Sequence, residues 1–184
     1  MNLTNREYAE AVQTCREIFL QKTTDYGSSW RVLRMISIAD QQFIKAQRIK
    51  NIQQTGKQLV SDDIPSEFRG IVNYGVIALI QLDLKNPAVE DLSLQETEIW
   101  FDKKIDQARE TMLLKNHDYG EAWREMSQES FVDLILMKLL RIRQILANQG
   151  KTLISEGIDA NFIDIINYGL FALILIAEGK HPGV

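Results

Sequence analysis

The chain has 184 residues, of which 25% are charged, and a formal net charge of −4. This length suits one domain or two tightly associated halves. The mildly acidic, interspersed charge excludes an extended nucleic-acid surface, although a local basic pocket stays compatible with it. Cys15 is the only cysteine, which excludes an intrachain disulfide framework and a cysteine-rich zinc site.

The N-terminal stretch is polar and has no apolar core of a signal peptide, so we expect a cytoplasmic protein. The two most apolar segments, 71–82 and 163–177, are shorter than the roughly 20 residues of a membrane span. We therefore interpret both as buried helices and expect no membrane partner.

Two helices are predicted before residue 57. Thr4 and Glu7 have the spacing of a capping box, and the helix that they open is expected to end near Lys22. Ser37 to Asp40 has the same spacing and predicts that a second helix starts there and stops before Gly56.

The third predicted helix begins near Pro65, where a missing amide hydrogen is harmless. Its apolar residues cover almost the whole circumference, so this helix must be central.

The same order recurs in the second half. Ser93 and Glu96 form a capping box for a fourth helix, and Ser130 to Asp133 predicts the start of a fifth. The sixth helix, at about 159–178, matches the third. We therefore divide the chain into a first repeat at 1–86, a linker at 87–92 and a second repeat at 93–184.

The duplication is clearest in the sequences KTTDYGSSWR at 22–31 and KNHDYGEAWR at 115–124, which lie 93 positions apart. No period-two strand pattern is present. The predicted fold is all-α, an internally duplicated three-helix unit forming a pseudo-two-fold six-helix bundle. The third and sixth helices should pack together, and Gly75 and Gly169 would permit close approach.

Several polar and aromatic positions are shared by both repeats, and together they predict a pocket with cations for phosphate and aromatic faces for a base. The predicted nucleotide-binding residues are Lys22, Asp25, Tyr26, Trp30, Lys45, Arg48, Asn73, Lys115, Asp118, Tyr119, Trp123, Lys138, Arg141, Asn167 and Tyr168. His117 and His181 are not repeated and are not expected to be catalytic.

Each shared position also has a structural alternative. Lys22 and its counterpart Lys115 could be favoured at helix ends by the helix dipole alone. Asp25 and its counterpart Asp118 could cap the turn that contains the tryptophan. The Lys45 and Arg48 pair lies on one helix face, and its anions could be Glu17 and Asp25 as well as a phosphate. Asn73 and its counterpart could simply fix the register of the two central helices.

The doubled K-x-x-D-Y-G-x-x-W pattern, the Lys/Arg helix and the N-Y-G helix resemble the bacterial nucleotide modification associated domain 1 family, in tandem form. The resemblance implies an all-α protein that binds or acts on nucleotides. Similar single-copy proteins show E-x-x-D-x-x-N-Y on the last helix. Each half of this chain keeps one of those carboxylates: Glu67 stands with Gly70, and Asp164 stands with Asn161.

A more distant similarity is to the all-α nucleoside triphosphate pyrophosphatases, which hold magnesium with E-E-x-x-E and E-x-x-D motifs. The first motif is absent here, so the magnesium ligands would have to come from Glu17, Glu110, Asp118 and Asp164.

Three functions are therefore open. The first is a nucleotide-handling enzyme, such as a magnesium-dependent hydrolase that releases pyrophosphate from a (d)NTP. The second is a non-catalytic binding or accessory module for a nucleotide or other phosphorylated small molecule. The third is a helical interaction protein with buried ion pairs. A homodimer is compatible with each, and we expect the second repeat, 115–168, to hold the better site.

Overall fold

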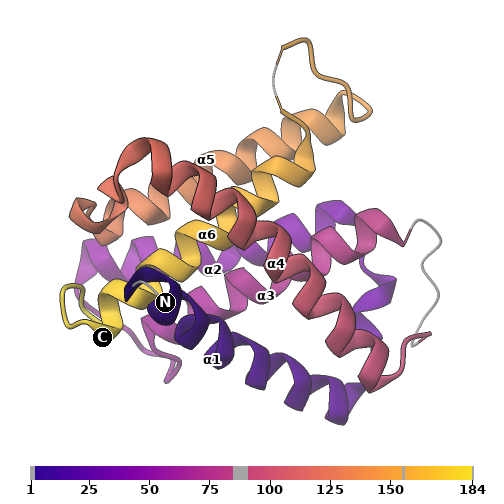
Figure 1. Cartoon of the computed structure of the whole chain (residues 1–184), viewed down its shortest axis with the longest axis horizontal. Helices are drawn as coiled ribbons and strands as arrows, with labels where there is room; N and C mark the ends of the chain where they lie inside the picture. The colour runs from indigo at the N-terminus through magenta and orange to yellow at the C-terminus, as the bar shows by residue number, and fades with distance from the viewer. Residues whose placement is uncertain (1–2, 85–90, 155, 184) are drawn as a thin grey trace.

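The computed structural model describes residues 3–84, 91–154 and 156–183, which form six α-helices and two short 3₁₀ helices without any strand. The first repeat contains α1 (Leu3–Tyr26), η1 (Ser29–Val32), α2 (Met35–Thr55) and α3 (Ile64–Asp83), and the second contains α4 (Leu94–Tyr119), η2 (Ala122–Glu125), α5 (Gln128–Ala147) and α6 (Ile158–Ala177). The two halves follow one plan, shown in Figure 1, which confirms the all-α bundle. The predicted linker falls mainly on 85–90, outside the described residues, so the domain boundary stays a prediction.

The centre of the molecule is the contact between α3 and α6, the most extensive between any two helices of the described residues. A Cβ added to Gly75 would lie 2.7 Å from Ile166 Cγ1, and one added to Gly169 would lie 2.8 Å from Val72 Cγ2. Gly169 and Ile166 are the counterparts of Gly75 and Val72, each 94 positions later. The same glycine contact is therefore made from both sides, as a pseudo-two-fold axis requires.

A second symmetric contact joins α2 to α5. Lys50 Nζ lies 2.7 Å from Asp133 Oδ1, and Arg143 Nη2 lies 2.7 Å from Asp40 Oδ1. Our prediction that these two aspartates close capping boxes is wrong. Helix α2 already begins at Met35 and α5 at Gln128, so both carboxylates lie inside a helix and reach across to the other repeat.

Two other helices, α4 and α1, were predicted to begin with capping boxes, and the structure has the box only at the start of α4. The capping box of Ser93 and Glu96 is confirmed, with both reciprocal hydrogen bonds present. Thr4 and Glu7 do not act as the box that their spacing suggests, because both side chains bond to Arg124 of the second repeat. Helix α1 also runs one turn beyond the expected Lys22 and ends before a glycine in the left-handed region, at φ +61°.

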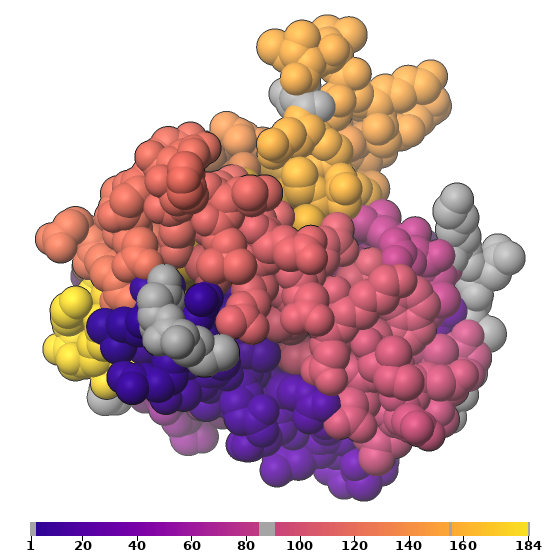
Figure 2. All heavy atoms as spheres, in the orientation of Figure 1, coloured from indigo at the N-terminus to yellow at the C-terminus, as the bar shows by residue number. Residues whose placement is uncertain are grey.

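Helix α6 is the one helix of the described residues that is long and apolar enough to cross a membrane, but most of it is buried within the protein. Its burial against α3 and α5 identifies it as the core helix that the sequence predicted. By contrast, the end of α5 and the start of the following connection project from the body of the molecule, as Figures 1 and 2 show.

The glycine contact leads to a first prediction. Gly75→Ala should lower the free energy of unfolding by about 1–3 kcal/mol, because the new methyl group would overlap Ile166 in a filled core. Urea denaturation measures this change. The matched control is Gly70→Ala, whose Cβ would meet only the flexible end of Lys45 and should cost much less. Equal losses for the two variants would contradict the close-approach argument.

Candidate functional site

A cavity of about 460 Å³ opens inside the first repeat, between α1, η1, α2 and α3. Five of its lining residues were predicted site residues, namely Lys22, Tyr26, Trp30, Lys45 and Asn73, and a sixth, Tyr74, is the counterpart of the predicted Tyr168. All of them come from the first repeat, so the cavity is a feature of one repeat and not of the interface between the two.

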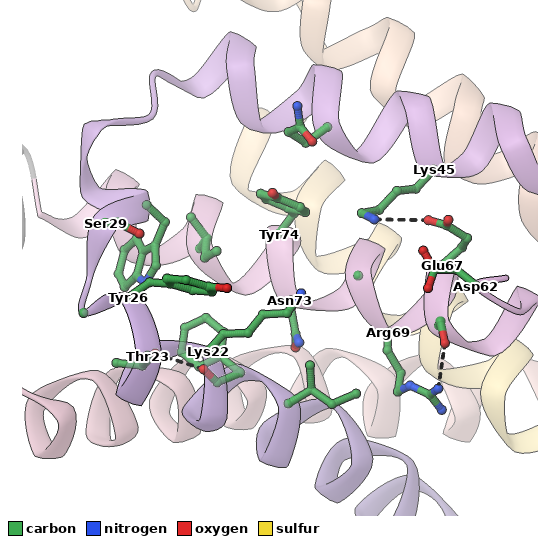
Figure 3. Close-up of a pocket in the computed structure, with 18 residues that line it drawn as sticks. Lys22, Thr23, Tyr26, Ser29, Lys45, Asp62, Glu67, Arg69, Asn73 and Tyr74 are labelled. Carbon is green, nitrogen blue, oxygen red and sulfur yellow. Dashed lines mark hydrogen bonds and ion pairs between the residues drawn. The ribbon is translucent and has the colours of Figure 1, made fainter. Parts of the chain in front are cut away.

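The cavity has two chemically different ends, as Figure 3 shows. Tyr26 and Ser29 lie at one end, and Lys45, Glu67 and Arg69 lie at the other, while Lys22 reaches toward the middle from α1. An aromatic and hydroxyl surface thus faces a charged one along the length of the cavity. This division matches a ligand that has a flat ring at one end and an anion at the other.

At the charged end, one carboxylate holds two cations. Glu67 Oε2 lies 3.1 Å from Lys45 Nζ, and Glu67 Oε1 lies 2.5 Å from Arg48 Nη1. Glu67 itself is buried, so two cations share one desolvated anion. Arg48 also donates to the carbonyl oxygens of Val60 and Asp62, which ties the connection before α3 to this end of the cavity.

Lys22 is the cation of the cavity for which no ion pair or hydrogen bond is found among the described residues. Its counterpart, Lys115, is paired with Asp164, but the first repeat has Gly70 at the position of that aspartate. A Cβ added to Gly70 would lie 2.8 Å from Lys45 Cε, so the missing side chain also keeps space open beside the lysine.

The corresponding region of the second repeat is closed. Asp164 lies 2.5 Å from Lys115 Nζ and 2.6 Å from Lys138 Nζ, so its carboxylate neutralises both lysines. Desolvation alone would lower the pKa of Lys115, but the hydrogen bond and charge of Asp164 outweigh it and raise this pKa. On the aromatic side, Phe171 stacks on Trp123 with ring centroids 4.2 Å apart.

The two asparagines of the central helices also differ. Each donates from Nδ2 to a backbone carbonyl of α1 or α4, at 3.1 Å from Asn73 to Cys15 and 3.0 Å from Asn167 to Ala108. Asn167 Oδ1 in addition accepts from the Tyr8 hydroxyl at 2.9 Å. The counterpart of Tyr8 is Phe101, and Asn73 Oδ1 is left buried without a hydrogen-bond partner among the described residues.

The structure does not gather all the predicted residues. Asp25, Asp118 and Tyr119 are exposed, and Arg141 is exposed on a separate cavity beside Asn161. The expected cap of the tryptophan turn by Asp25 or Asp118 is not formed, since the cap positions of η1 and η2 are Ser28 and Glu121. The second repeat, which we expected to hold the better site, therefore has its cations dispersed or already paired.

The proposed metal ligands are also dispersed. Glu17, Glu110 and Asp118 are exposed, and Asp164 is engaged by two lysines. Within the described ranges, no three His, Cys, Asp or Glu side chains come together as a metal site would require. The residues present do not fit a metal centre of the kind that we hypothesised.

The predicted site omitted three residues that line the cavity: Asp62, Glu67 and Gly70. Glu67 could have been chosen as the buried-side acid in the first turns of α3, close to the two cations of α2. Gly70 was noted only as a departure from the E-x-x-D pattern, although aligning the repeats places this glycine opposite Asp164, where the first repeat has no side chain.

Among the described residues, Asn167 Oδ1 has a hydrogen-bond donor and Asn73 Oδ1 has none, which predicts opposite changes in stability for two variants. Tyr8→Phe should destabilise the protein by about 1–3 kcal/mol, because it leaves buried Asn167 Oδ1 without a donor. Burial raises the pKa of Tyr8, which keeps its hydroxyl protonated as that donor. Phe101→Tyr should instead be stabilising, because it offers Asn73 Oδ1 a donor. Thermal and urea unfolding measure both, and a loss of stability in both variants would contradict the explanation.

The carboxylate of Asp164, which pairs with both Lys115 and Lys138, leads to a third prediction about stability. Asp164→Asn should cost about 3–5 kcal/mol, because Lys138 would be left buried without its anion. Since the folded pKa of Lys115 is raised, its stabilising contribution is present below the ordinary lysine pKa of 10.5 and is lost as the pH rises through the raised value. Unfolding measured from pH 7 to pH 11 should therefore show an alkaline loss in the natural protein that the variant lacks. Asp159→Asn, at the exposed start of α6, serves as the control.

Comparison with known proteins agrees with this division into repeats. Two segments, 22–82 and 115–176, match the family described as nucleotide modification associated domain 1, and together they span about two thirds of the chain. No curated protein and no solved structure matches the chain, and nothing supports the more distant similarity to nucleoside triphosphate pyrophosphatases. The first segment begins at Lys22 and the second at Lys115, the paired lysines of the two repeats. The chain therefore belongs to the nucleotide modification associated domain 1 family and carries that domain twice.

Proposed function

We propose that this protein is a nucleotide-binding module whose site is the cavity of the first repeat. The observation that carries the proposal is Lys22, a cation that faces the cavity and has no anion among the described residues. Membership of a family associated by name with nucleotide modification supports a nucleotide as the anionic ligand.

The size and polarity of the cavity suit this ligand. Pockets for small molecules are commonly about 300–1,000 Å³, with mainly apolar walls and a few polar groups that fix orientation. The ring of a base would lie against Tyr26 and Trp30, and the phosphate would lie between Lys22 and Lys45. Trp30 Nε1 and Asn73 Oδ1 are both buried without partners among the described residues, so they add a donor and an acceptor for polar atoms of the ligand.

Binding is better supported than hydrolysis. A magnesium-dependent hydrolase needs carboxylates that are free to hold the ion and its phosphates. Glu67 already accepts from Lys45 and Arg48, which leaves Asp62 as the available carboxylate of the cavity lining. We therefore propose a non-catalytic or accessory role, in the cytoplasm, where free nucleotides are present. Release of pyrophosphate from a (d)NTP with magnesium would favour the hydrolase instead.

Nucleotide titrations with matched lysine variants test the proposal. Isothermal titration calorimetry with each of the four common deoxynucleotides, as monophosphate and as triphosphate, should detect binding to the natural protein. Lys22→Ala should weaken the binding about tenfold or more, since a charge-assisted hydrogen bond contributes about 1.5–3 kcal/mol. Gly70→Asp should have at least as large an effect, because it copies the closed arrangement of the second repeat.

The control is Lys115→Ala, the same substitution at the counterpart position. It should leave the affinity unchanged, because Lys115 is engaged by Asp164 outside the cavity. Equal weakening by the two lysine variants would mean that the binding site is not in the first repeat. Absence of binding by every nucleotide tested would remove the proposed function.

A further inference from the structure

The charges around the cavity also limit how many phosphates the ligand carries. We infer that the first repeat takes a nucleotide with a single phosphate, a nucleoside monophosphate, in preference to a triphosphate. This inference rests on the proposed function, but it concerns a different property of the same site.

The charge balance at the phosphate end is only slightly positive. Four cations lie there or hold residues there: Lys22, Lys45, Arg48 and Arg69. Against them stand Glu67, which binds two of the cations, Asp63, which lies 3.9 Å from Arg69, and Asp62 in the lining. Three carboxylates thus cancel three of the four positive charges.

A single phosphate suits this balance. A phosphomonoester carries about −1.5 to −2 charges at pH 7, and the one net positive charge at this end neutralises about half to two thirds of that. Every additional phosphate brings at least one more negative charge. No further unpaired cation of the described lining is present to receive it.

The position of Asp62 also opposes a ligand with more than one phosphate. Figure 3 shows Asp62 and Glu67 at the same end of the cavity as Lys45, beyond the middle that Lys22 reaches. A second or third phosphate, extending away from the aromatic end, would approach these two carboxylates. Glu67 is neutralised by its two cations, so the repulsion comes from Asp62, an exposed carboxylate of the lining whose negative charge opposes a longer phosphate chain.

The discriminating experiment is a titration of the natural protein with the monophosphate and triphosphate of one deoxynucleoside, first in EDTA and then with magnesium. The monophosphate should bind at least about tenfold more tightly in EDTA. Asp62→Asn should narrow that preference by strengthening triphosphate binding, because it removes one repelling charge and keeps the size of the side chain. Glu156→Gln, at the counterpart position of the second repeat, should leave the preference unchanged.

The outcomes separate the two proposals. Triphosphate binding that equals or exceeds monophosphate binding in EDTA would overturn the inference while leaving the nucleotide site in place. Triphosphate binding that becomes tighter than monophosphate binding only with magnesium would also overturn it, and would show that an ion bridges Asp62 and the phosphates. An unchanged preference in Asp62→Asn would overturn the role of that carboxylate. If no nucleotide binds under either condition, the proposed function itself fails.

Discussion

The close contact of α3 with α6 is the constraint on which the rest of the structure depends. Each helix is apolar nearly all round and needs cover on every side, and a glycine from each lets the two approach at the axis. The other helices then surround this pair, and salt bridges between α2 and α5 hold the outer layer in the same symmetric relation. The core is filled at this axis, and the cavity that contains the predicted residues lies away from it, within the first three-helix unit.

The positions of the carboxylates then determine which cations of each repeat are paired. The two repeats differ at two positions of the last helix: Glu67 stands opposite Asn161, and Asp164 stands opposite Gly70. In the first repeat, Glu67 neutralises the pair on α2 and leaves Lys22 without an anion among the described residues. In the second, Asp164 neutralises Lys115 and Lys138 and leaves Arg141 exposed on the surface. The single carboxylate that each copy carries at these positions therefore pairs with different cations in the two repeats.

Much of the fold could be predicted from the sequence because its signals are local or repeated. The duplicated K-x-x-D-Y-G-x-x-W pattern, the apolar helices and the glycine pair are visible without coordinates, and the structure has the repeated helices and the glycine contact as expected. The failures involve tertiary partners. Ser37 to Asp40 has the spacing of a cap, but Asp40 binds Arg143 of the other repeat, and no local rule reveals this. The open cavity also could not be recognised, because the aligned repeats show Gly70 but do not show which cations lack partners in the folded protein.

Joining both copies in one polypeptide has an evolutionary consequence. In a homodimer of single-domain chains, every substitution appears on both sides of the axis, so a side chain that fills one site also fills the other. Here Tyr8 satisfies the asparagine on one side, and its counterpart Phe101 cannot do so on the other. Within one polypeptide the two halves can differ, and here Lys115 and Lys138 are paired with Asp164, while Lys22 has no ion pair among the described residues.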